Sequence, residues 1–238
     1  MRLEVDDLHA GYVSGIDILR GLSLIARSGQ LTTAIGANGV GKSTLLKCVV
    51  GQLRPHAGRI ACEGAEITGL ATHRLARRGI AYIAQRRNLF PHLSVRENLE
   101  MGTWSFRRDR ARAGRAIARA LEEAPLLARF AGRPAGQLSG GQQRLLEIER
   151  ALLPDPALLL VDEPTVGLDP RTATLIYRRL RQLSAEQRRT VLMVDQNVIA
   201  GTEIADHIYV IELGAIKLEA SRAEFDARYR ATIGEWLI

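Results

Sequence analysis

A short run near residue 40 combines glycines, a lysine and two hydroxyl side chains in a spacing that suits phosphate binding. It reads Gly36-Ala37-Asn38-Gly39-Val40-Gly41-Lys42-Ser43-Thr44 and fits the pattern G-x-x-x-x-G-K-[ST]. Glycines let backbone N–H groups turn inward around a phosphate, and the start of a helix adds partial positive charge. Lys42 would reach the β- and γ-phosphates, and the Ser43 hydroxyl would coordinate Mg²⁺. The plainer alternative is a glycine-rich turn that happens to precede a lysine. We predict nucleotide contacts from Gly36, Asn38, Gly39, Gly41, Lys42, Ser43 and Thr44.

Two acidic residues end an apolar run later in the chain. Residues 157–161 are continuously apolar, as in a strand buried on both faces, and Asp162 and Glu163 follow directly. Asp162 would hold Mg²⁺ through water, and Glu163 is placed to orient and polarise an attacking water. Taken alone, this pattern fits a metal site or a helix cap equally well. Its pairing with the glycine-rich loop favours the metal site.

A second segment has the features of an anion-binding helix start. It reads Leu138-Ser139-Gly140-Gly141-Gln142-Gln143-Arg144, and the residues after Ser139 continue in a helical pattern to about Leu153. Ser139 suits the N-cap position, where bare backbone N–H groups and a small hydroxyl can hold an anion. The alternative is a capped helix without a ligand. With the first loop, the chain would carry two phosphate-binding helix ends.

The surrounding pattern predicts the elements that must position these residues. Residues 2–35 are rich in β-strand patterns, a helix is expected from 42 to about 50, and residues 58–67 suggest a hairpin arm. Residues 94–151 are helical in pattern. A strand is expected at 80–83, and from 157 onward strands at 157–161, 191–194 and 208–211 alternate with helices from 171 and 198. This order predicts an α/β core with a mainly parallel sheet and a helical insert.

Composition narrows the class of protein. The chain has 238 residues, of which 46% are hydrophobic, enough to bury a sizeable core. No apolar run approaches the roughly 20 residues of a membrane span, and the acidic start does not resemble a signal peptide. Two cysteines are too few for a disulfide scaffold, so a reducing compartment is the simplest interpretation. The histidines lack ligand spacing, and Trp104 and Trp236 are expected to be packing residues.

The formal net charge of +7 comes almost entirely from arginine. Such a balance could favour nucleic acid or an anionic membrane surface. The arginines recur on amphipathic stretches among Glu and Asp, and no aromatic residues interleave as single-strand binding would require. We therefore favour a solvated helix face.

The chain resembles the ATP-binding subunits of ABC transporters. Residues 138–142 match the signature motif of that family, and the resemblance covers essentially the whole chain. It implies one P-loop NTPase domain over 1–238, with an antiparallel β subdomain, an α/β core over 1–86 and 152–238 and a helical subdomain over 87–151. It also implies a head-to-tail dimer that sandwiches ATP between Lys42 of one protomer and the partner's signature helix. The residues implied for that second contact are Ser139, Gly140, Gly141 and Gln142.

The same resemblance implies roles for further positions. Tyr12 lies where the family has an aromatic residue that stacks on adenine, and an ordinary strand aromatic is the alternative. Gln85 matches the glutamine that senses Mg²⁺ and the γ-phosphate. Residues 88–98 resemble the segment that receives a coupling helix of the membrane subunit. Asp169 lies in the loop that communicates across the dimer, and with Pro170 it also suits a helix start.

One position departs from the general family pattern. Gln196 stands where most members have a histidine that contacts the γ-phosphate. Glutamine can still donate a hydrogen bond but cannot carry positive charge, which bears on the rate and pH dependence of hydrolysis. Gln196 followed by Asn197 resembles one branch, the importers of branched-chain amino acids and related amides. This chain is similar to the shorter of the two ATP-binding subunits of such importers.

These features lead to a main expectation and two alternatives. We expect an ATP-hydrolysing subunit, with ATP and Mg²⁺, on the cytoplasmic face of the inner membrane. Its expected partners are permease subunits, a second ATP-binding subunit (identical or not) and an extracytoplasmic solute-binding protein, with no nucleic acid. One alternative is an ABC ATPase acting on nucleic acid or the ribosome. The other is a regulatory module that hydrolyses poorly because of Gln196, against which Glu163 argues.

Overall fold

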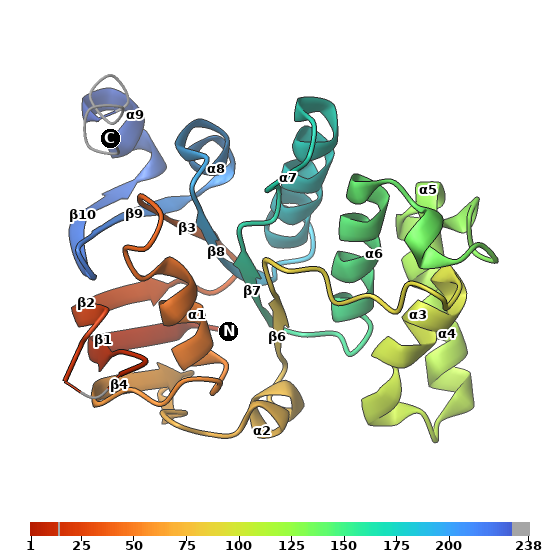
Figure 1. Cartoon of the computed structure of the whole chain (residues 1–238), viewed down its shortest axis with the longest axis horizontal. Coiled ribbons are helices and arrows are strands. Elements are labelled where there is room, and N and C mark those ends of the chain that lie inside the picture. Colours follow the sequence, from red (N-terminus) through yellow and green to blue (C-terminus); the bar gives the residue numbers. More distant parts are fainter. Residues whose placement is uncertain (14, 230–238) are drawn as a thin grey trace.

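A six-stranded, mainly parallel sheet forms the centre of the molecule. The computed structural model describes residues 1–13 and 15–229. Three strands are buried along their whole length, as expected for central strands of a sheet that is covered on both faces. Neighbouring strands of this sheet are parallel, except that the last two strands along the chain pair in the antiparallel direction. The strand order is β10 (Ala215–Ser221), β9 (His207–Glu212), β3 (Leu31–Ile35), β8 (Thr190–Asp195), β7 (Leu158–Asp162) and β6 (Ile80–Ile83) (Figure 1).

A smaller antiparallel sheet packs beside the first. Its pairing of residues 57–62 with 65–66 confirms the hairpin expected at 58–67. Its strand order is β2 (Leu19–Ala26), β1 (Leu3–Ala10), β4 (Ala57–Cys62) and β5 (Ala65–Glu66). The predicted combination of a parallel core sheet with an antiparallel β subdomain is therefore confirmed.

Helices cover the parallel sheet on both faces. The helix α1 (Lys42–Val49) buries Leu45 and Leu46 in one core cluster together with residues of both sheets. A second cluster on the opposite face takes in Ile148 of α6 (Gly140–Leu152) and residues of three further helices. These are α7 (Pro170–Ala185), α8 (Val198–Ile204) and α9 (Arg222–Arg228) (Figure 1). A further short helix, α2 (Thr72–Arg77), directly precedes β6 in the chain. The sequence patterns did not predict β10 and α9.

The predicted helical insert forms an arm to one side of the sheet (Figure 1). Its apolar residues, among them Val95, Leu99, Ile117 and Leu146, make a third core cluster. Short 3₁₀ turns at Trp104–Phe106 and Ala135–Gln137 join its helices. We call this part, α3 to α6, the helical arm. Its helices are α3 (Val95–Gly102), α4 (Arg110–Glu123), α5 (Pro125–Ala128) and α6 (Gly140–Leu152).

The expectation that Trp104 is a packing residue is wrong. Its side chain is 60% exposed because it lies in the short turn after α3, at the edge of the arm. The guanidinium of Arg107 stacks over the indole ring, 4.0 Å from its centroid. Trp236 lies outside the described residues.

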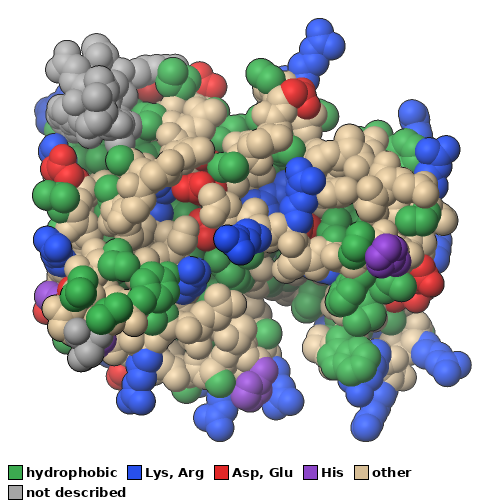
Figure 2. Space-filling model, viewed as in Figure 1, with side chains coloured by type: hydrophobic (Ala, Val, Ile, Leu, Met, Phe, Trp, Pro, Cys, Tyr) green, Lys and Arg blue, Asp and Glu red, His purple; other side chains and the backbone are tan. Residues whose placement is uncertain are grey.

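Basic side chains are spread over the viewed face among acidic and apolar ones (Figure 2). On α4, Arg112, Arg115 and Arg119 are exposed, and Arg119 pairs with Glu123 one turn later. This arrangement fits the solvated helix face that the sequence favoured. Among the described residues, no helix has the length and apolar character needed to cross a membrane.

Candidate functional site

The glycine-rich loop connects the buried strand β3 to α1, the position that phosphate binding requires. Gly41 caps α1 with a φ of 111°, a left-handed conformation that favours glycine. A Cβ on Gly36 would come within 2.5 Å of the carbonyl oxygen of Ile211, so that position also needs glycine. Lys42 is 4% exposed, and its Nζ donates to the carbonyl oxygens of Gly36 and Ala37 at 2.8 Å each. The loop is therefore tightly formed around the lysine ammonium.

Asp162 ends β7 next to the loop, as the sequence predicted. The Ser43 hydroxyl donates to its Oδ1 at 2.9 Å, and the Tyr82 hydroxyl donates to its Oδ2 at 3.0 Å. Burial, reinforced by the charge of Asp162, raises the pKa of Tyr82, so the phenol stays a donor. Sequence reasoning missed Tyr82 because a tyrosine within a strand gives no local sign of function.

Glu163 follows at once in a strained conformation. Its φ is 41°, and its N–H donates to the carbonyl oxygen of Val194 on β8. Such strain in a non-glycine residue is concentrated at functional sites. The carboxylate is held between two groups: Gln85 Nε2 donates to Oε2 at 2.6 Å, and Lys42 Nζ lies 3.5 Å from Oε1. Lys42, Gln85 and Glu163 thus meet at one point.

The second phosphate-binding segment begins α6, as predicted. Ser139 is the N-cap and forms a capping box with Gln142. Its side chain is exposed, whereas Gly141 packs against α7 so closely that a Cβ would come within 1.8 Å of Thr172 Cγ2. Because α6 belongs to the helical arm and α1 to the opposite part of the molecule, the two helix starts predicted to bind phosphate lie apart within one chain (Figure 1).

Asp169 caps the core helix α7, with Pro170 at its first position. Its Oδ1 accepts from the N–H groups of Arg171 and Thr172 at 3.1 Å each, and the Thr172 hydroxyl donates to Oδ2 at 2.6 Å. The hydrogen bonds from Thr172 are the main reason that the pKa of Asp169 is lowered. The helix-cap prediction is confirmed, and the exposed carboxylate also lies in the loop that follows Glu163.

Tyr12 and Gln196 are both exposed at the margins of this site. Tyr12 is 55% exposed, and its hydroxyl accepts a hydrogen bond of 2.9 Å from Lys47 of α1. Gln196 follows β8, the neighbour of β7, so it lies at the sheet edge that carries Asp162. Tyr12 thus contacts the helix that follows the loop, and Gln196 follows the strand next to β7.

A further buried acid lies beside Gln196. Asp195 is 1% exposed, and burial raises the pKa of its carboxyl. Tyr177 donates to its Oδ2 at 2.7 Å, and Thr165, from the segment after Glu163, contacts the same phenol at 2.8 Å. Sequence reasoning missed Asp195, although it ends a buried apolar strand just as Asp162 does.

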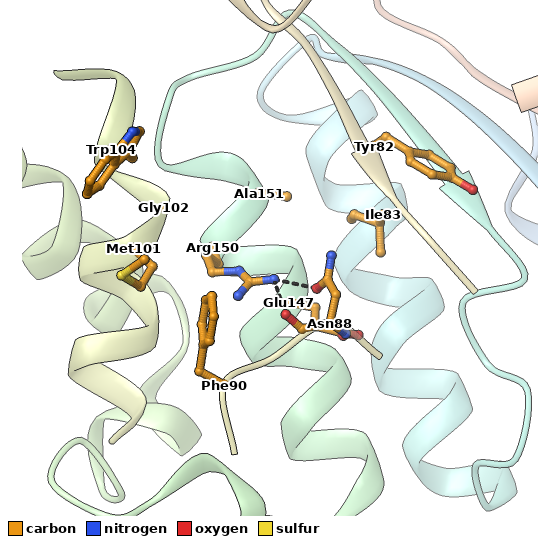
Figure 3. A pocket seen from close by; sticks show the side chains of 10 residues that line it. All are labelled: Tyr82, Ile83, Asn88, Phe90, Met101, Gly102, Trp104, Glu147, Arg150 and Ala151. Carbon is orange, nitrogen blue, oxygen red and sulfur yellow. Dashed lines mark hydrogen bonds between the residues drawn. The ribbon is translucent and has the colours of Figure 1, made fainter. Parts of the chain in front are cut away.

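A groove of about 560 Å³ lies between β6 and the helical arm (Figure 3). Its arm side carries the exposed hydrophobic residues Phe90, Met101 and Trp104, and its floor carries Glu147 and Arg150. Figure 2 shows a hollow between the core and the arm, with hydrophobic side chains on the arm side. The groove is bordered by part of the segment 88–98. Asn98, fully buried, fixes that segment by exchanging hydrogen bonds of 2.9 Å with the backbone of Phe90.

Comparison with known proteins identifies a family. Residues 19–166 match the family model described as "ABC transporter". The chain is 36% identical to a probable branched-chain amino acid transport ATP-binding protein, LivF, of Archaeoglobus fulgidus, over 91% of each chain. It is 38% identical to the high-affinity branched-chain amino acid transport ATP-binding protein BraG of Pseudomonas aeruginosa, covering 89% of this chain and 90% of the relative. A phosphonates import ATP-binding protein, PhnC 1, of Ruegeria sp. is 35% identical, with coverage of 95% and 94%.

Solved structures share the fold over nearly the whole chain. One is cbiO1 of Clostridium perfringens, described as part of the ABC transporter complex cbiONQ. It has a TM-score of 0.87 and 27% identity, with 96% of this chain and 92% of that chain covered. Another is a dimeric ATP-binding cassette in a post-hydrolysis state bound to ADP and Pi. It has a TM-score of 0.81 and 27% identity, with coverage of 92% and 98%.

Proposed function

The chain belongs to the ABC transporter family and is an ATPase of that family, and from this premise we propose that it powers a membrane importer whose pore other chains form. The observation that carries the proposal is the meeting of Lys42, Gln85 and Glu163 beside Asp162 and Ser43. These groups come from three segments that lie far apart in the chain. Their convergence supplies a phosphate-binding lysine, a metal-binding acid and a second acid that can act on water.

The roles follow from this geometry. The backbone N–H groups of the loop and Lys42 would hold the β- and γ-phosphates of ATP, while Tyr12 would stack on the adenine. Glu163, held by Gln85 Nε2, would orient and polarise the attacking water. Gln196 would donate a hydrogen bond to the γ-phosphate.

The donor set also fits Mg²⁺. Ser43 and Asp162 supply oxygen atoms that already lie within 2.9 Å of each other, and Gln85 keeps its amide oxygen available because its Nε2 contacts Glu163. Hard cations prefer such oxygen ligands. These three side chains would hold Mg²⁺, which supplies charge neutralisation at the phosphates.

We propose that the second half of each nucleotide site comes from a second ATP-binding subunit. Ser139, Gly140, Gly141 and Gln142 form the start of α6, at which Ser139 is exposed, and this start lies apart from Lys42 of the same chain. A head-to-tail dimer would bring this end, and Asp169, to the partner's nucleotide. The dimeric cassette among the structural relatives supports this arrangement.

The groove supports a membrane partner. Its exposed aromatic and sulfur side chains form an apolar surface beside the segment 88–98, and Arg150 contributes a positive charge to its floor. Exposed apolar surface rimmed by polar groups marks protein interaction sites. We propose that a coupling helix of the permease docks here and brings the chain to the cytoplasmic face of the inner membrane.

The solute is proposed from the relatives alone. Two of them are named for branched-chain amino acids and one for phosphonates. We propose branched-chain amino acids or related small amides, delivered by an extracytoplasmic solute-binding protein. Since all of these relatives are transport proteins, they give no support to the alternative of an ATPase acting on nucleic acid.

The test is co-purification of the tagged chain from detergent-solubilised membranes of its native cell. We expect polytopic membrane proteins, with a second ATP-binding subunit, to be recovered with the wild-type chain. Trp104→Glu, which charges the groove, should lose about 90% of that recovery, since an unpaired charge at a docked surface costs several kcal/mol. The matched control is Leu213→Glu, a similarly exposed apolar residue (74%) away from the groove. Recovery of soluble or nucleic-acid partners alone would overturn the transport proposal.

A further inference from the structure

Arg144 is a buried arginine one turn into α6, and its side chain contacts both halves of the candidate catalytic site. It is 4% exposed. Its Nε donates to the carbonyl oxygen of Pro164 at 2.9 Å. Its Nη1 donates to the carbonyl oxygen of Ala84 at 2.7 Å and to Glu147 Oε2 at 3.0 Å. Its Nη2 donates to the carbonyl oxygens of Asp162 at 3.0 Å and Glu163 at 3.3 Å. A guanidinium has five N–H donors, and each of them finds an acceptor here.

Four of the five acceptors belong to the two segments that carry the reacting groups. Ala84 directly precedes Gln85, and the carbonyl oxygens of Asp162 and Glu163 belong to the proposed metal-binding and water-polarising residues themselves. A planar, rigid guanidinium fixes the distance between the groups it binds. Arg144 therefore sets the spacing across which Gln85 meets Glu163.

Glu147 links Arg144 to the part of the chain that follows Gln85. It lies one turn after Arg144 and is also 4% exposed. Its Oε1 accepts from the backbone N–H of Asn88 at 2.7 Å, while its Oε2 accepts from Arg144. Gln85 is thus bracketed: Arg144 holds the residue before it, and Glu147 holds the chain three residues after it. Glu147 also lines the groove (Figure 3).

We propose that Arg144 is a positioning residue for ATP hydrolysis, holding Glu163 and Gln85 in register with the signature helix, with Glu147 as its anchor. The proposal rests on the roles proposed above for Glu163 and Gln85. Burying two charges is unfavourable unless they are paired and fully hydrogen-bonded, and the five bonds of Arg144 meet that condition. Any buried acceptors would serve the stability of the fold. Four of the five hydrogen bonds of Arg144, however, end on the two segments of the catalytic site, which favours a role in positioning.

The test compares Arg144→Lys with Arg179→Lys. Lysine keeps the charge but replaces the fork by a single point. Arg179 is a matched control: it is 7% exposed and bonds to Glu149 of α6 at 2.7 Å and to Glu123 of α4 at 2.6 Å, without contact to either catalytic segment. We expect Arg144→Lys to lower kcat by about 10- to 100-fold, because small displacements of reacting groups have effects of this size, with KM for ATP within about threefold. Arg179→Lys should keep kcat within about threefold even if its Tm falls.

A second variant covers the case in which Arg144→Lys does not fold. Glu147→Gln has one amide oxygen for two N–H donors, so either Arg144 or Asn88 loses its acceptor. We expect a loss of about tenfold in kcat, and the Gln85→Ala/Glu147→Gln double variant should be no slower than the worse single variant, since both act through one unit. Equal kcat losses in Arg144→Lys and Arg179→Lys, or multiplicative losses in the double variant, would overturn the positioning role.

The catalytic roles of Glu163 and Gln85, on which this proposal rests, are tested separately. Glu163→Gln and Gln85→Ala should each lower kcat on their own. If neither does, the proposed catalytic roles fail, and the positioning role fails with them. If both do while Arg144→Lys and Glu147→Gln match the wild type, only the positioning role is overturned.

Discussion

The Nε2 atom of Gln85 donates a hydrogen bond of 2.6 Å to Oε2 of Glu163, a residue 78 positions later in the chain. Gln85 lies between the core strand β6 and the helical arm, whereas Glu163 directly follows the neighbouring strand β7. The contact therefore joins the connection to the arm directly to the acid proposed to act on water.

Replacing Lys42 tests the phosphate loop. Lys42→Ala removes the ammonium that bonds to the carbonyl oxygens of Gly36 and Ala37 and would contact the phosphates. We expect ATP affinity, measured by equilibrium titration, to fall by at least about tenfold, since hydrogen bonds to charged groups contribute about 1.5–3 kcal/mol. Lys217→Ala, on the edge strand β10, is the control for loss of a positive charge. Retained tight binding by Lys42→Ala would mean that the loop is misassigned.

Gln196 offers a test through the pH dependence of hydrolysis. A glutamine stays neutral at every pH, so position 196 should contribute no titration to the kcat of the wild type. Gln196→His should add a step near pH 6.5, the usual pKa of histidine. Gln196→Ala should lower kcat without changing the shape of the profile. Superimposable profiles and rates for all three proteins between pH 5.5 and about 8.5 would remove Gln196 from the site.

The junction between the arm and α7 predicts acid sensitivity. Burial alone would raise the pKa of Glu123, but hydrogen bonds from Arg179, Arg119 and Gln187 lower it to about 2. Because the folded-state pKa lies below the ordinary value of 4.5, ionised Glu123 stabilises the fold above pH 4.5, and this contribution is lost as the pH falls toward 2.

The corresponding variant is Glu123→Gln. The free energy of unfolding from urea titrations should be lower than that of the wild type at pH 7, and the difference should shrink at about pH 3. Glu122→Gln, its exposed neighbour on α4, should change little at either pH. A difference for Glu123→Gln that grows on acidification would contradict the assigned direction of the pKa shift.

The features that could be predicted from the sequence are those that depend on residues close together in the chain. The loop ending in Lys42, the apolar strand ending in Asp162 and Glu163, and the caps Ser139 and Asp169 are each defined by neighbouring residues. Their physical reasons (glycine conformation, strand burial, free N–H groups at a helix start) can therefore be read from short stretches. The parallel sheet followed from the alternation of strands and helices.

What the sequence did not reveal depends on contacts between distant segments. Arg144 ends the segment 138–144 that the sequence analysis singled out, yet no role was predicted for it, because only the folded chain places Ala84, Glu163 and Pro164 around it. Tyr82 likewise meets its partner Asp162 from 80 residues away. Trp104 was misjudged because large apolar residues are usually buried, whereas this one borders a groove.

The central claim is that the two phosphate-binding ends of this chain meet only between two subunits. The most direct test is light scattering of Glu163→Gln, alone or with the second ATP-binding subunit that co-purifies with it, with and without ATP. ATP should trap a dimer because binding survives while the water loses its polarising group, and adding Ser139→Arg, which fills the exposed start of α6, should keep the subunits apart. A Glu163→Gln protein that stays monomeric with ATP bound, or a dimer indifferent to Ser139→Arg, would contradict the shared site.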